Sequence, residues 1–271
     1  MTKIKASCVL ITGGASGIGR IMGRRALEKG AEALVIWDIN QANIDQTCKE
    51  FSALGTTLGQ RVDVSSSEQI AKAYATIKAQ LGRVDLLINC AGIVTGNRYF
   101  DQMSEEEIHR TMQINSLAPM QVALQLLPDM IARNEGHICN IASAGGLLAN
   151  PRMSVYAASK WAMIGWSDSL RVELKERKSR VRITTIAPYY INTGMFDGVQ
   201  SRWFMPILDP ENTSRKILRA VERNRTFCGI PWGYHVVRFL QGIFPTPVFD
   251  FMFGQLFGVY HTMDHFTGRK Q

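Results

Sequence analysis

The sequence predicts an α/β fold: one doubly wound, parallel sheet with helices packed on both of its faces. Two observations lead to this prediction. Short runs of β-forming residues alternate with longer helical patterns over most of the chain. One short run, Val84–Asn89, is largely apolar, as expected of a strand that is buried on both faces. No linker or internal repeat interrupts the 271 residues, so we expect a single domain over residues 1–271.

Six strands follow from these patterns, and each gap between them is long enough for a crossover helix. The predicted strands are Ser7–Thr12, Ala33–Asp38, Leu58–Val62, Val84–Asn89, Gly136–Ser143 and Val181–Ala187. The clearest helical patterns between them are Gly17–Lys29, Ser67–Gln80, Ser104–Arg133 and Tyr156–Lys178. Strand–helix–strand units with short loops pair their strands in parallel. We expect the core of the domain over residues 5–230 and an apolar, helical C-terminal extension over residues 231–271.

The composition is that of a soluble globular protein in a reducing compartment. Hydrophobic residues make up 46% of the chain, an ordinary value for such proteins. The five cysteines are scattered without CxxC or metal-ligand spacing, so we expect free thiols and no metal site. The first apolar run leads directly into a glycine-rich loop, which is a strand pattern and not that of a signal peptide. These features favour a cytoplasmic location.

The chain is basic, with a formal net charge of +8. From Glu211 onward, eight basic residues face four acidic ones. No dense Lys/Arg run with interleaved aromatic residues is present, so we do not expect nucleic-acid binding. An anionic lipid surface is the charged partner that the sequence supports better.

A glycine-rich loop, Thr12–Gly19, lies between the first predicted strand and the first predicted helix. Glycines let the backbone turn sharply and approach a pyrophosphate, whose charge suits a helix N-terminus. The loop therefore predicts a dinucleotide site. Its candidate cofactor-binding residues are Gly13, Ser16, Gly17, Ile18 and Gly19.

Asp38 ends the second predicted strand, where a carboxylate can accept hydrogen bonds from both ribose hydroxyls of NAD and repel a 2′-phosphate. Neither Ile39 nor Asn40 is basic, so NAD(H) is favoured over NADP(H), with Asp38 and Ile39 as cofactor-binding candidates. The alternative is a helix-capping or turn aspartate. Asp63 and Val64 end the third strand at the same edge of the sheet and are candidates to meet the adenine.

Tyr156 and Lys160 lie four residues apart in a helical pattern, which places both on one face of the helix. A nearby ammonium favours the phenolate and lowers the pKa of the phenol from its ordinary value of about 10. Such a phenol can exchange a proton with an alcohol or carbonyl oxygen. The alternative for this short pattern is an ordinary surface helix.

The order and spacing of seven elements between about residues 7 and 195 resemble the short-chain dehydrogenase/reductase family. The elements are the glycine loop, Asp63-Val64, Asn89-Cys90-Ala91-Gly92, Asn115, Ser143, Tyr156-x-x-x-Lys160 and Pro188 through Thr193. The resemblance implies a Rossmann-like fold with a seven-stranded sheet and a nicotinamide cofactor. It also implies assembly into a homodimer or homotetramer.

The resemblance implies a role for each matching residue. Tyr156 is expected to be the general acid/base, and Lys160 to lower its pKa and bind the nicotinamide ribose. Ser143 is expected to hydrogen-bond the substrate oxygen. Asn115 is expected to hold a water that links the lysine to solvent in a proton relay.

The remaining matches concern the cofactor. The candidates are Asn89, Ala91 and Gly92 after the fourth strand, and Pro188, Ile191 and Thr193 around the nicotinamide carboxamide. Two positions depart from the family pattern: Cys90 replaces an asparagine, and Tyr189 replaces a glycine. Since no cationic residue is near Cys90 in the sequence, we expect a structural adjustment there without thiol chemistry.

The Asn192–Met195 ending resembles the subgroup that contains retinol and some steroid dehydrogenases. It implies an NAD-dependent oxidoreductase that acts on the CH–OH group of a lipophilic alcohol, or on the matching carbonyl. Two alternatives remain: a dinucleotide-sensing protein without turnover, and a membrane-surface adaptor whose tail is the functional part.

The last segments are apolar. Trp203, Phe204 and Met205 follow the carboxamide loop, where a substrate lid is expected, and Ile243–Tyr260 is rich in phenylalanine. This tail has three interpretations: packing on the body or on a second subunit, an apolar substrate entrance, and contact with a membrane interface. The tail is too short and its prolines too early for a membrane span.

Overall fold

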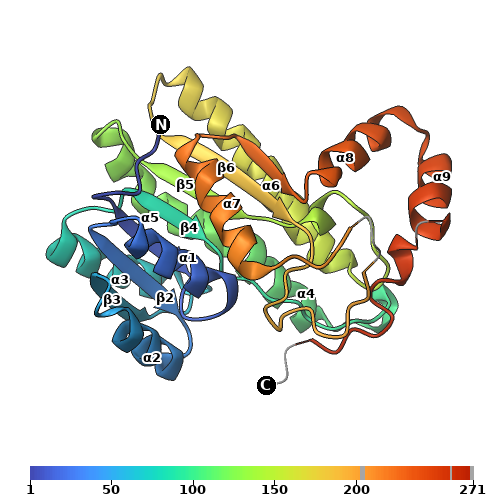
Figure 1. Ribbon diagram of the computed structural model, residues 1–271, viewed down its shortest axis with the longest axis horizontal. Coiled ribbons are helices and arrows are strands. Elements are labelled where there is room, and N and C mark those ends of the chain that lie inside the picture. Colours follow the sequence, from blue (N-terminus) through green and yellow to red (C-terminus); the bar gives the residue numbers. More distant parts are fainter. Residues whose placement is uncertain (202–204, 257, 269–271) are drawn as a thin grey trace.

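The computed structural model describes residues 1–201, 205–256 and 258–268 and contains one seven-stranded sheet (Figure 1). Its strands are β1 (Cys8–Thr12), β2 (Ala33–Asp38), β3 (Thr56–Arg61), β4 (Leu86–Asn89), β5 (His137–Ile141), β6 (Arg182–Pro188) and β7 (Phe227–Ile230). All neighbours pair in parallel, in the order β3-β2-β1-β4-β5-β6-β7. The predicted doubly wound sheet is therefore confirmed. The strand order reverses between β1 and β4, and ligands of such sheets bind at the carboxyl edge there.

Helices cover both faces of the sheet. They are α1 (Gly17–Glu28), α2 (Gln41–Phe51), α3 (Ser67–Leu81), α4 (Glu105–Met112), α5 (Ala118–Ala132), α6 (Ser154–Glu176) and α7 (Pro210–Glu222). The side chains of β2 show why two layers form. Leu34 and Ile36 pack into the hydrophobic cluster with α1, α2 and α7, whereas Val35 and Trp37 pack into the cluster with α3 and α5.

The helix predicted over Ser104–Arg133 is interrupted, and this corrects the sequence analysis. A wide π-helical turn over Gln113–Leu117 separates α4 from α5, and the N–H of Ala118 bonds the carbonyl of Gln113 five residues before it. Pro119 accounts for part of the interruption, because it has no N–H to offer the carbonyl of Asn115 in an α-helical bond. Asn115 therefore lies in the widened turn and not in a regular helix.

The seventh strand was implied only by the family resemblance and not by a pattern of its own. β7 has four residues, one of them glycine, and it lies at the edge of the sheet. Such a short edge strand gives no clear alternation in the sequence.

His137 lies fully buried at the start of β5. Its Nε2 lies 2.8 Å from Thr184 Oγ1, and that hydroxyl donates to the carbonyl of Arg225. Nε2 therefore carries the proton, and Nδ1 lies 2.8 Å from Oγ1 of Thr2, whose hydroxyl donates to Asn224 Oδ1. Burial and the charge of Arg182 lower the pKa of His137 to about 3, so the ring is neutral.

Residues after β7 form an arm, which we call the C-terminal arm (residues 231–256 and 258–268). It contains α8 (Gly233–Ile243), α9 (Thr246–Phe249), π-helical turns over Asp250–Leu256 and a 3-10 turn over Val259–His261. Figure 1 shows α8 and α9 projecting from the body, after which the chain turns back. The apolar, helical extension expected from the sequence is thus present. None of the described helices is long and apolar enough to cross a membrane.

Candidate active site

A cleft of about 810 Å³ lies at the carboxyl edge of the sheet, where the loops after β1, β4, β5 and β6 meet. Thirteen of the site residues predicted from the sequence line this cleft. They are Gly13, Ser16, Gly17, Ile18, Gly19, Ala91, Gly92, Ser143, Tyr156, Lys160, Pro188, Ile191 and Thr193. The position of the cleft matches the edge at which open α/β sheets bind ligands.

The glycine loop presents bare backbone to this cleft. Gly13 has a φ of +66°, and a Cβ there would lie 3.0 Å from Cα of Ala91. A Cβ on Gly19 would lie 2.3 Å from the carbonyl oxygen of Gly13. The hydroxyl of Thr12 joins the loops after β1 and β4 by accepting from the N–H groups of Cys90 and Ala91. The result is a concave backbone surface at the N-terminus of α1, which fits a pyrophosphate.

Asp38 lies beside this loop and outside the lining of the cleft. Its carboxylate accepts from the N–H of Ala15 and from the N–H of Asn40, both at 3.1 Å. Asp38 therefore caps the local turn, which was the alternative interpretation of this residue. Its carboxylate also has further lone pairs that could accept from ribose hydroxyls. Ile39 is largely exposed next to it. Together with the bare glycine loop, this carboxylate fits a dinucleotide whose pyrophosphate lies at α1.

The other nominated cofactor residues outside the cleft lining serve the local structure. Asp63 accepts from the N–H and the hydroxyl of Ser65, and Val64 is buried. Asn89 is buried and donates to Asn140 at 2.8 Å. Among the residues that the structure describes, the side-chain oxygen of Asn89 has no hydrogen-bond partner. Asn89 thus has a buried acceptor without a partner, whereas Ser65 bonds one oxygen of the Asp63 carboxylate.

Ser143, Tyr156 and Lys160 form a compact cluster at the floor of the cleft. Tyr156 and Lys160 lie one turn apart near the start of α6, and both are buried. Ser143 follows β5, and its Oγ accepts from the N–H of Gly145 at 3.1 Å and lines the same cleft as the Tyr156 side chain. The Lys160 ammonium donates to the carbonyl of Ile141 at 3.1 Å and lies 5.7 Å from the centre of the Tyr156 ring.

The pKa of Tyr156 differs from the sequence-based expectation. Burial raises it to about 12, and the polar hydroxyl of Ser143 acts in the opposite direction. The expected lowering by Lys160 is absent in the chain alone, because desolvation of the phenolate outweighs the attraction of an ammonium that faces Ile141. Burial also lowers the pKa of Lys160, to about 8.

Asn115 connects the loop after β4 to α6. Its Oδ1 accepts from the N–H of Ile93 at 2.8 Å, and its Nδ2 donates to the Ile93 carbonyl and to Ser159 Oγ. A Cβ on Gly92 would lie 3.3 Å from Asn115 Oδ1 and 3.5 Å from Lys160 Nζ, so the three groups are close together. Asn115 therefore fixes the surroundings of Lys160, and the predicted proton relay stays a prediction.

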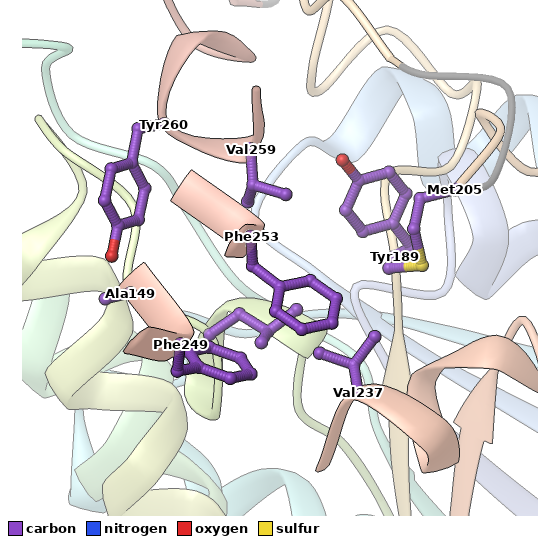
Figure 2. Close-up of a pocket in the computed structure, with 9 residues that line it drawn as sticks. Ala149, Tyr189, Met205, Val237, Phe249, Phe253, Val259 and Tyr260 are labelled. Atoms are coloured by element: carbon purple, nitrogen blue, oxygen red, sulfur yellow. The ribbon is translucent and has the colours of Figure 1, made fainter. Parts of the chain in front are cut away.

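Two apolar cavities continue from the cluster away from the cofactor side. The first, about 430 Å³, begins at Ser143 and Tyr156. The second, about 370 Å³, which we call the apolar chamber, is shown in Figure 2. The two share Leu148, Ala149, Tyr189 and Val259. The two cavities are therefore neighbours and lie between Tyr156 and the C-terminal arm.

The C-terminal arm builds much of the apolar chamber. Val237 of α8, Phe249 and Phe253 point into it, opposite Tyr189 and Met205 (Figure 2). The rings of Phe249 and Phe253 stack with centres 4.5 Å apart. The arm therefore packs on the body and lines an apolar cavity, in line with two of the three interpretations of the tail. Of the predicted lid residues, Met205 lines the apolar chamber, whereas Trp203 and Phe204 lie outside the described residues.

Tyr190 and Asn150 are site residues that sequence reasoning missed. Both line the cavity next to Tyr156, and Nδ2 of Asn150 donates to the Tyr190 hydroxyl and to Thr262. This contact ties the returning end of the C-terminal arm to the site. The available signal was the pair of adjacent tyrosines directly after a strand, a position where side chains face the ligand edge.

Comparisons with known proteins place the chain in one family. The family described as short chain dehydrogenase matches residues 7–202. The chain is similar to epidermal retinol dehydrogenase 2 of Mus musculus, with 33% identity over 99% of this chain and 87% of that protein. It is also similar to estradiol 17-beta-dehydrogenase 11 of Pongo abelii, with 31% identity over 89% of this chain and 80% of that protein. Among solved structures, a short chain dehydrogenase/reductase from Burkholderia phymatum in complex with NAD has a TM-score of 0.82 at 23% identity, over 90% of this chain and 95% of that one.

Proposed function

Because the chain belongs to the short-chain dehydrogenase/reductase family of oxidoreductases, we propose that it transfers a hydride between NAD(H) and the alcohol or carbonyl carbon of a lipophilic substrate. One observation carries the proposal. The Ser143 and Tyr156 side chains lie where the cofactor cleft meets the apolar cavities, so a substrate oxygen bound there has its carbon chain in apolar surroundings.

The nicotinamide, when bound, accepts or supplies the hydride. In the oxidising direction, Tyr156 in its phenolate form takes the proton of the substrate hydroxyl, and Ser143 holds the same oxygen by a hydrogen bond. In the reducing direction, Tyr156 returns a proton to that oxygen. Lys160, with a pKa of about 8, is mostly protonated at neutral pH and places a positive charge beside the phenol.

NAD(H) is the preferred cofactor in this proposal. Its support is the Asp38 carboxylate, which the N–H groups of Ala15 and Asn40 fix at the end of β2. A carboxylate at this position repels the 2′-phosphate of NADP(H).

The substrate class follows from the apolar lining and from the relatives. The cavities between Tyr156 and the C-terminal arm include the apolar chamber, lined by aliphatic and aromatic side chains from the body and the arm (Figure 2). Retinol and estradiol, which appear in the names of similar proteins, are the first substrates to test, together with long-chain alcohols.

The test compares Tyr156→Phe with the unchanged protein, by NADH formation with retinoids, steroids and long-chain alcohols. We expect loss of turnover with NADH binding retained. Tyr99→Phe, at an exposed tyrosine, is the matched control and should keep full activity. Equal activity of Tyr156→Phe and wild type would refute the mechanism. Tight NADH binding without turnover on the whole panel would instead indicate a dinucleotide-sensing protein.

We also propose that the chain forms a homodimer through α5 and α6. Exposed apolar side chains line one face of each helix: Leu117 and Leu124 seven residues apart around α5, and Trp161 and Val172 eleven residues apart on α6. Such faces are covered in most soluble proteins. Leu124→Arg should convert a dimer to a monomer in light scattering, and a monomeric wild type would refute the proposal.

A further inference from the structure

We propose that the corner formed by α7, β7 and α8 docks onto an anionic lipid surface. Four basic residues, Lys216, Arg219, Arg223 and Arg225, line a cavity of about 630 Å³ beside β7. We call it the cationic cavity. It is separate from the cofactor cleft and from the apolar chamber.

The charges of the cationic cavity are left uncompensated by the surrounding protein. Among the described residues, none of its four basic side chains forms an ion pair. The acidic residues of α7 face the other way: Glu211 pairs with Arg24 and Arg25 of α1, and Glu222 pairs with Lys29. Helix α7 therefore directs its acidic residues to α1 and leaves its basic ones for another partner.

An exposed apolar stripe adjoins the cationic cavity. Trp232, which lines the cavity, is 77% exposed, and Val236, Phe239 and Ile243 are 39%, 67% and 57% exposed. Their spacing of four, three and four residues places them on one side of α8. Val248, Phe251 and Leu256 add exposed apolar side chains further along the C-terminal arm.

Helix α8 is held firmly on its opposite side, so the stripe is not the result of a detached helix. Tyr234 and Val237 are buried against the body, and Nε2-H₂ of Gln241 donates to the carbonyl of Leu147 at 3.0 Å. The guanidinium of Arg238 lies over the Phe227 ring at 4.9 Å. The same helix therefore presents Val237 to the apolar chamber and the stripe to the outside.

An anionic lipid surface satisfies both features at once. Lipid phosphates neutralise the cationic cavity, while the acyl boundary takes up the apolar stripe, with a tryptophan at the level of the headgroups. A second copy of the chain placed symmetrically on this face would bring like charges together. A nucleic acid would match the charges and leave Trp232, Phe239 and Ile243 in water.

The experiment measures binding of the full chain to two kinds of vesicle: phosphatidylcholine alone, and phosphatidylcholine with about 30% phosphatidylglycerol. We expect co-sedimentation with the anionic vesicles, a blue shift of tryptophan emission, and much weaker binding to phosphatidylcholine alone. The triple variant Arg219→Gln/Arg223→Gln/Arg225→Gln should bind anionic vesicles on the order of a hundredfold more weakly, at about fivefold per charge. Phe239→Ser should reduce the binding and the emission shift.

Matched controls separate this surface from general charge and apolarity. Lys72→Gln/Arg110→Gln/Lys175→Gln removes three exposed charges from α3, α4 and α6, and Leu54→Ser removes an exposed apolar side chain elsewhere. Both controls should bind as wild type does. Equal loss of binding in the control triple and the cavity triple would overturn the proposal.

Three further outcomes would also overturn it. The first is equal binding to both kinds of vesicle. The second is binding of inorganic phosphate by calorimetry without vesicle binding, which would make the cationic cavity a site for a soluble anion. The third is a wild-type oligomer that Phe239→Ser dissociates, again without vesicle binding, which would make the stripe a subunit interface. Hydride transfer from a short, water-soluble alcohol to NAD serves as the fold control, so failure of docking and failure of the proposed activity remain distinguishable.

Discussion

Acid should destabilise this protein through a single buried histidine in the sheet. His137 is neutral in the folded chain because burial and Arg182 lower its pKa to about 3. In the unfolded chain the imidazole takes its ordinary pKa of 6.5. Between these values only the unfolded chain binds the proton, so stability is complete above pH 6.5 and falls as the pH decreases below it.

The size of the loss follows from the unfolded pKa. At pH 5 the unfolded chain lies 1.5 pH units below the ordinary pKa of 6.5, which favours unfolding by about 2 kcal/mol relative to pH 7. The folded pKa hardly matters at pH 5, because the ring stays neutral there. Since Thr2 and Thr184 occupy both ring nitrogens, no carboxylate is bonded to the ring to stabilise the charged form.

Urea unfolding at pH 7 and pH 5 measures this effect for wild type and His137→Asn. The variant is expected to be less stable at both pH values, and its loss between them should be smaller than that of wild type by about 2 kcal/mol. His109→Asn, at an exposed histidine, should show the wild-type loss. If wild type and His137→Asn lose equal stability between pH 7 and pH 5, the reasoning is wrong.

Three substitutions test the two halves of the site. Gly19→Ala puts a Cβ 2.3 Å from the Gly13 carbonyl oxygen and should weaken NADH binding about tenfold in a fluorescence titration, whereas unchanged affinity would argue against a tight loop. Asp38→Asn removes the charge that opposes a 2′-phosphate, so the ratio of kcat/KM for NADPH to that for NADH should rise about tenfold; a constant ratio would contradict the assigned role. Val237→Trp reduces the volume of the apolar chamber. We expect kcat/KM for long alcohols to fall about fourfold for each methylene group that can no longer enter the chamber, and kcat/KM for short alcohols to stay unchanged. Equal losses for all chain lengths would mean that the chain does not occupy the chamber.

The cluster of Ser143, Tyr156 and Lys160 was predictable because its parts follow regular elements. Tyr156 and Lys160 share a helix face by spacing alone, and Ser143 follows a strand whose carboxyl end must lie at the ligand edge. The glycine loop was predictable for the same reason, since it joins the first strand to the first helix.

Properties that depend on contacts between distant segments were not predictable. The raised pKa of Tyr156 results from burial, to which Phe196 contributes an edge-on ring with its centre 6.1 Å away. The apolar chamber needs Val237 and Phe249 to meet Tyr189 from another part of the chain. The spacing of residues within one helix or strand does not indicate which residues of distant segments they will contact.

The π-helical turn over Gln113–Leu117 amounts to one residue more than a continuous α-helix needs. Deletion of Ser116 would let α4 and α5 join as one regular helix, but it would also rotate one against the other by about 100°. Asn115, which holds Ile93, and the α5 residues Val122 and Leu126, which pack in the core with α3, could then no longer face their partners together. A helix without the widened turn would therefore be incompatible with the contacts of the loop that borders Lys160. We expect deletion of the extra residue to be poorly tolerated, even though it would leave a more regular helical backbone.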